Sequence, residues 1–139
     1  MLQTFPLLTL SLIVYSALAF MSRGSAVPWY DTESFVVELI SGDSWRITGG
    51  HLFLMFSMLL LFIELLRATK TRSASIMNHA LSVILFVVTL LLFVMVKSYG
   101  NSTFFLFMSM ALLDFMAGFI ITTVTSRRDL SVGERSETP

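Results

Sequence analysis

The sequence predicts an all-α membrane protein: a four-helix transmembrane bundle with a short extracytoplasmic β-hairpin between its first and second helices. Of its 139 residues, 55% are hydrophobic and 13% are charged, and the mean hydropathy is +0.82, outside the range of soluble domains. Four apolar segments are each close to the length that crosses a hydrocarbon core about 30 Å thick as a helix. They cover residues 5–21, 50–67, 78–96 and 103–125.

These segments fill more than half of the chain, so we expect a single membrane domain over residues 1–126. A polar cytoplasmic tail without regular structure is expected over residues 127–139. The first segment is expected to stay in the protein. Ala17-Leu18-Ala19 has the small-x-small pattern of a signal-peptide cleavage site, but residues 1–6 lack the basic region that precedes such peptides.

The one sizeable loop, residues 22–49, predicts a hairpin over about residues 35–48. Two β-prone runs flank the turn residues Ser41-Gly42-Asp43. An amphipathic surface helix is the alternative, but the β-branched pair Val36-Val37 favours strands. Because an isolated hairpin is only marginally stable, we expect lipid headgroups, helix ends or a neighbouring subunit to support it.

The distribution of Lys and Arg predicts the orientation of the chain in the membrane. Six of these residues flank the segments on one side and three on the other, which places both termini and the loop after residue 67 in the cytoplasm. The six are Arg67, Lys70, Arg72, Arg127, Arg128 and Arg135, and the three are Arg23, Arg46 and Lys97. Arg23, directly after the first segment, fits this orientation less well.

Asp114 is the single charged residue of the last apolar segment and lies near its middle. A carboxylate at this depth is unfavourable by at least a few kcal/mol unless it is paired or protonated. On a helix it shares a face with the small residues Ala111, Ala117 and Gly118, which permit close helix packing. We therefore expect the Asp114 side chain to point into protein and not toward lipid.

Hydroxyl groups are the expected partners of Asp114, because each of the other three segments carries one near its own midpoint. No Lys or Arg lies at that depth, so burial favours the neutral, protonated acid. Separately, Asn78, Ser82 and Thr89 form one polar stripe on the third segment. The midpoint hydroxyls are those of Ser57, Thr89, Ser11 and Tyr15.

Two interpretations of Asp114 remain open. It can be a hydrogen-bonding clamp that fixes helix register or a subunit contact. It can also be a titrating site that takes up a proton or a cation, with Glu64, about two turns away, as an inner relay. Glu64 and Arg67 are three residues apart and are expected to form an ion pair at the inner interface.

Patterns that indicate catalysis or a cofactor are absent from the sequence. There is no cysteine for a thiolate site, and nucleophile-elbow, zinc-helix and phosphate-loop motifs are missing. His51 and His79 begin helices at opposite membrane faces, too far apart to ligate one haem. The formal net charge of zero argues against a nucleic-acid partner. We expect no enzyme activity, no cofactor and no metal site.

Two stretches, HLFLMFSMLLLFIELLRATKTRSASIMNHALS and STFFLFMSMALLDFMAGFIITTVTSRRDL, resemble an uncharacterised family of small four-span inner-membrane proteins of proteobacteria. FIELLRATKT, STFF and ALLDFMAGF are the specific parts, and the similarity covers roughly residues 49–130. The resemblance implies a four-span topology and places Glu64, the basic loop and Asp114 in a shared pattern, but it implies no activity, substrate or cofactor. Four-span drug exporters have this size too, but their essential acid lies in the first helix, which here carries none.

The expected function is that of an oligomeric scaffold or an accessory subunit of an inner-membrane complex. Its partners would be the lipid bilayer and either further copies of the chain or another membrane protein. The alternative is a small proton- or cation-conducting oligomer, or a transporter component, that uses Asp114.

Overall fold

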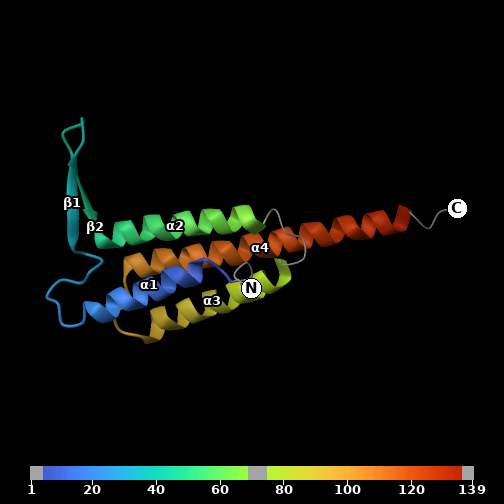
Figure 1. Cartoon of the computed structure of the whole chain (residues 1–139), viewed down its shortest axis with the longest axis horizontal. Coiled ribbons are helices and arrows are strands. Elements are labelled where there is room, and N and C mark those ends of the chain that lie inside the picture. The colour runs from blue at the N-terminus through green and yellow to red at the C-terminus, as the bar shows by residue number, and fades with distance from the viewer. Residues whose placement is uncertain (1–4, 69–74, 136–139) are drawn as a thin grey trace.

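The computed structural model describes residues 5–68 and 75–135 of the chain, which are mostly helical. Four helices and one small antiparallel hairpin make up this part, as the sequence predicts (Figure 1). The basic residues Lys70 and Arg72 and the side chain of His79 lie outside the described residues. In chain order the elements are α1 (Leu8–Met21), β1 (Glu33–Glu38), β2 (Ser44–Thr48), α2 (Gly49–Ala68), α3 (Ser75–Met95) and α4 (Ser102–Arg135).

Two helices of the described chain are long and apolar enough to cross a membrane. They are α2 and the part of α4 over Ser102–Ile120. The apolar helix α1 has only 14 residues, and α3 has 21, of which Ala80–Met95 is the apolar part whose side chains the structure describes. Helix α1 begins at Leu8, two residues after Pro6, a residue that is common at helix starts because its missing N–H would have no partner within the helix. The structure therefore has the four helices that the sequence predicts, but over the described residues only two of them qualify individually as membrane spans.

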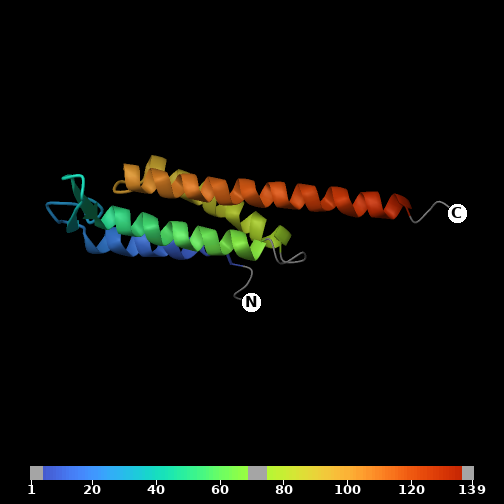
Figure 2. The same ribbon diagram turned by 90° about the horizontal axis from the view of Figure 1, so that it is seen from above.

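Helix α4 corrects the expectation of an irregular tail. It continues past residue 125 to Arg135 and projects beyond the other three helices (Figures 1 and 2). The sequence contains no proline between Pro28 and Pro139, so nothing interrupts the hydrogen-bonding pattern of the last helix. Extending an existing helix fixes one residue for each new hydrogen bond, which makes continuation easier than a new start.

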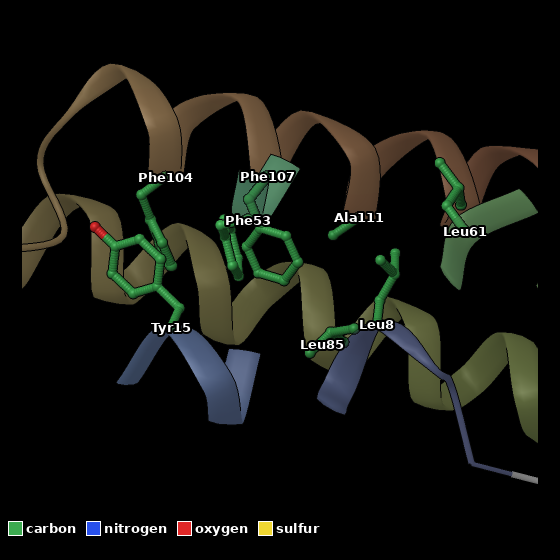
Figure 3. Packing of buried hydrophobic residues seen from close by; sticks show 8 residues of the cluster. All are labelled: Leu8, Tyr15, Phe53, Leu61, Leu85, Phe104, Phe107 and Ala111. Carbon is green, nitrogen blue, oxygen red and sulfur yellow. The ribbon is translucent and has the colours of Figure 1, made fainter. Parts of the chain in front are cut away.

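The core lies along the line where α4 meets the other helices. Helix α4 packs against α3 on one side and α2 on the other, and α1 packs against α2. Figure 3 shows the aromatic end of this core, where Tyr15, Phe53, Phe104 and Phe107 gather. The ring centroids of Tyr15 and Phe104 are 4.7 Å apart, and those of Phe53 and Phe107 are 5.5 Å apart.

Gly50 lets the start of α2 approach α4 and the preceding loop. A Cβ atom at this residue would lie 2.6 Å from Thr103 Oγ1 and 2.9 Å from the Tyr30 carbonyl oxygen. Helix α4 begins beside it, where Asn101 Oδ1 accepts a hydrogen bond of 3.0 Å from Phe104 N. The two helices therefore start at the same end of the molecule and run parallel.

The hairpin stands across the helix axes at this end of the bundle (Figures 1 and 2). Val37 pairs with Trp45, and Gly42 in the turn has a φ of +88°, a conformation that glycine adopts without steric conflict. Every residue of β1 is exposed, whereas Ile47 near the end of β2 is buried. The hairpin is thus attached to the bundle only at its base.

Candidate functional site

The described helices bury polar side chains and expose large apolar ones. Apolar side chains such as Phe53 and Phe107 are buried as well, but the many large apolar side chains that stay exposed suit a helical cluster surrounded by lipid. All four helices contribute exposed apolar residues, for example Ile13, Phe62, Val87 and Phe119. The buried polar side chains are Ser11, Ser57, Glu64, Ser82, Thr89 and Asp114.

Asp114 lies in the interior, as the small residues around it predict, and is only 5% exposed. Its Oδ2 atom accepts a hydrogen bond of 2.5 Å from Ser82 Oγ on α3. This distance is at the short end of the range for a hydroxyl donor, typical of bonds that involve a carboxyl group. The bond joins α3 to α4 at positions 32 residues apart in sequence.

The hydroxyls of Thr89 and Tyr15 have partners other than Asp114. Thr89 Oγ1 donates to the Phe86 carbonyl oxygen within its own helix, at 2.8 Å. Tyr15 donates to the Ser98 carbonyl oxygen at 3.0 Å, at the hairpin end of the bundle. Thr89 is not the partner on α3, as predicted from the segment midpoints, because the antiparallel register that sets Ser82 beside Asp114 places Thr89 about two turns away. The stripe shared by Ser82 and Thr89 was the signal for the observed partner.

Ser11 and Ser57 are fully buried, and within the described chain neither hydroxyl has a hydrogen-bond partner. Helices α1 and α2 run antiparallel, with the rings of Tyr15 and Phe53 5.3 Å apart toward one end. Ser11 lies one turn before Tyr15, and Ser57 lies one turn after Phe53. Because the two helices are antiparallel, both serines are displaced from the rings in the same direction and occupy the same level. Ala111 of α4 lies near this level, which makes it a layer of small side chains between the aromatic rings and Asp114.

Glu64 is buried with 3% exposure and contacts the beginning of α1. Its Oε2 atom accepts a hydrogen bond of 3.3 Å from Leu8 N, the first amide of that helix. Helix α1 has no acidic residue in its first turn, and Leu7 at its N-cap supplies no side-chain hydrogen bond. Glu64 thus provides from α2 an acceptor for the first amide of α1, which has no partner within its own helix. The expected ion pair between Glu64 and Arg67 stays a prediction.

Glu64 and Asp114 are closer in level along the bundle than the sequence predicts. Because Gly50 lies beside Thr103 and Phe53 beside Phe107 on parallel helices, the same offset sets Glu64 level with residues 117–118 of α4. That is about one turn beyond Asp114, and not the two turns expected from the sequence. Sequence spacing could not give this offset, because it depends on the close approach at Gly50.

No protein-family model, no curated protein and no solved structure matches this chain. The resemblance to a four-span proteobacterial family therefore remains an expectation based on its quoted motifs.

Proposed function

We propose that this chain is a non-enzymatic protein of the bacterial inner membrane that crosses the bilayer four times, with both termini in the cytoplasm. It acts as an oligomeric scaffold or as an accessory subunit of a membrane complex. The exposed apolar surface on all four helices supports membrane embedding. Helix α1 lies along α2, with Leu8 near Glu64 and Tyr15 near Phe53. If α2 crosses the bilayer, α1 must lie within the same layer.

The short helices are compatible with four crossings. Helix α1 has 14 residues and a length of about 21 Å, less than the hydrocarbon thickness. A bilayer adapts to short helices by thinning, and interfacial aromatic residues anchor their ends. Trp29 and Tyr30, which follow α1, have edge-to-face rings 5.8 Å apart at the hairpin end.

The observation that carries the scaffold role is the hydrogen bond between Ser82 and Asp114. It uses the intramembrane acid to connect two helices, and Glu64 likewise uses its carboxylate to hold the start of α1. Each of the two buried acids therefore connects its own helix to another helix of the same subunit. Such bonds contribute on the order of 1 kcal/mol in membranes, yet they fix a specific helix register.

Asp114→Asn tests this role, because asparagine keeps an oxygen acceptor for the Ser82 hydroxyl but cannot release a proton. We expect the variant to keep the oligomeric mass and the co-purifying partners of the wild type in mild detergent. Asp114→Leu, which removes the acceptor, is expected to lower thermal stability. Proton flux in wild-type proteoliposomes that disappears in the asparagine variant would reject the scaffold role.

Proton or cation conduction is the second candidate, favoured by the closeness of the two acids. Glu64 and Asp114 lie on adjacent parallel helices about one turn apart in level, which gives a relay a second group nearby. This role predicts that Glu64→Gln and Asp114→Asn each abolish flux. A wild-type protein that conducts neither protons nor monovalent cations would eliminate it.

A further inference from the structure

Two adjoining cavities lie at the hairpin end of the bundle, between the end of α1 and the turn that joins α3 to α4. The larger, of about 270 Å³, is lined by the segment from Ser22 to Ser25 and by the aromatic residues that follow it. The smaller, of about 180 Å³, includes Lys97 in its lining. Ala19, Arg23 and Ser98 line both cavities, so the two adjoin, and together they are called the notch.

The notch carries positive charge without an acid to balance it. Arg23 and Lys97 contribute to its walls, and no Asp or Glu does. Among the described residues, neither cation forms an ion pair; Arg46, which lies in the hairpin, does so with Glu33 at 2.9 Å. The Arg23 guanidinium lies 5.1 Å from the centre of the Phe20 ring, which holds it at the edge of the apolar surface.

The backbone at Ser98, in the wall of the notch, is held in an uncommon conformation. Its φ is 77°, a left-handed conformation uncommon for a residue other than glycine. Its carbonyl oxygen accepts hydrogen bonds from Tyr15 Oη and Asn101 Nδ2, both at 3.0 Å, which hold this conformation. Backbone strain of this kind is concentrated at binding and active sites. Ser98 and Ser25 both line the larger cavity, and serine hydroxyls can donate hydrogen bonds to an anion.

Exposed apolar side chains at the ends of α1 and α3 border this notch. Phe20 and Met21 at the end of α1 and Val94 and Met95 at the end of α3 are among the most exposed apolar side chains of the described chain. We propose that the notch binds the headgroup of an anionic phospholipid, with its phosphate between Arg23 and Lys97 and its acyl chains along this apolar surface. The acyl-chain contact rests on the proposed membrane location, whereas the phosphate contact does not.

A phospholipid fits this site better than the acidic hairpin of a second copy. The hairpin also carries carboxylates, but Val36 and Val37 beside them are exposed apolar residues that a small polar notch would leave unburied. A phospholipid instead combines a compact anion with apolar chains in the arrangement that the two surfaces present. Placing two cations here also accounts for Arg23, whose position conflicts with the general charge distribution.

Native mass spectrometry of the full chain in detergent tests the proposal, with phosphatidylglycerol, phosphatidylcholine and inorganic phosphate as separate probes. We expect phosphatidylglycerol to stay bound preferentially and Arg23→Gln and Lys97→Gln each to weaken its binding by roughly fivefold. Arg46→Gln is the matched control, since it removes one cation from the same end of the molecule, outside the notch. It should leave lipid binding unchanged.

Three results would overturn the proposal. Equal phosphatidylglycerol binding by all variants would show that the notch does not bind the lipid. Binding of inorganic phosphate that displaces the lipid would assign the notch to a free anion. Dissociation of an oligomer by Arg23→Gln with unchanged lipid binding would assign it to a neighbouring hairpin. Carbonate extraction of the source membranes reports insertion separately, so a protein that is not inserted would contradict the proposed function and leave the phosphate result standing.

Discussion

At the scale of single residues, the buried serines differ in whether their hydroxyls are used. Ser82 donates to Asp114, whereas Ser57 has no partner within the described chain. Removing a used hydroxyl leaves a buried acceptor with one bond fewer, but removing an unused one takes away an unfavourable buried polar group. We expect Ser82→Ala to lower the free energy of unfolding by about 1 kcal/mol. Ser57→Ala should leave it unchanged or raise it.

Thermal unfolding in one detergent compares the two alanine variants directly. They make the same chemical change on two different helices, α3 and α2, at fully or nearly fully buried positions, so each serves as the control for the other. Equal destabilisation by both would show that the hydrogen bond to Asp114 has no special role.

Glu64 leads to a prediction about the beginning of α1. Because its carboxylate accepts from Leu8 N, Glu64→Ala should free the first turn of α1 at a loss of about 1 kcal/mol, while Glu64→Gln keeps an oxygen acceptor. Hydrogen exchange of the first amides of α1 measures this change. Glu38→Ala on the exposed hairpin is the control and should not alter exchange there. Unchanged protection in the Glu64→Ala variant would contradict the capping role.

At the scale of elements, the packing of α2 against α4 depends on a glycine. Gly50→Ala would place a methyl group 2.6 Å from Thr103 Oγ1, and we expect it to destabilise the protein by about 1–3 kcal/mol. Gly100→Ala is the matched control, because the nearest atom to its added Cβ is 3.7 Å away. Thr103→Ala should recover part of the loss in a double variant, as thermal unfolding would show. No loss in Gly50→Ala would mean that the helices are not so close.

Sequence patterns predicted the elements better than their ends and their register. The turn Ser41-Gly42-Asp43 located the hairpin, and the small residues beside Asp114 gave its inward direction. The sequence did not predict the continuation of α4 to Arg135, because the polar composition of residues 127–135 is typical of an irregular tail even though no proline interrupts it. The partner of Asp114 was missed because register depends on contacts between helices, which spacing along one helix does not contain.

At the scale of the whole molecule, the proposed function requires four helices that pass through one bilayer, with the polar side chains buried between the helices. The hairpin and the α3–α4 turn lie at one end, and the beginning of α1 and the end of α2 lie at the other (Figure 1). Four crossings place these ends on opposite sides of the membrane. Only α2 and α4 are long and apolar enough to span a membrane among the described residues, and two such helices do not by themselves require four crossings.

Labelling of single cysteines with a membrane-impermeant maleimide tests this claim most directly, because the natural chain contains no cysteine. Cysteines replace Phe5, Ile40, Ala68 and Ser102, which lie in turn at alternate ends of the bundle. With an intact inner membrane and the outer membrane permeabilised, Ile40→Cys and Ser102→Cys should react. Phe5→Cys and Ala68→Cys should react only after the inner membrane is opened. Reaction of Ile40→Cys and Ala68→Cys from the same side would contradict the four-span arrangement.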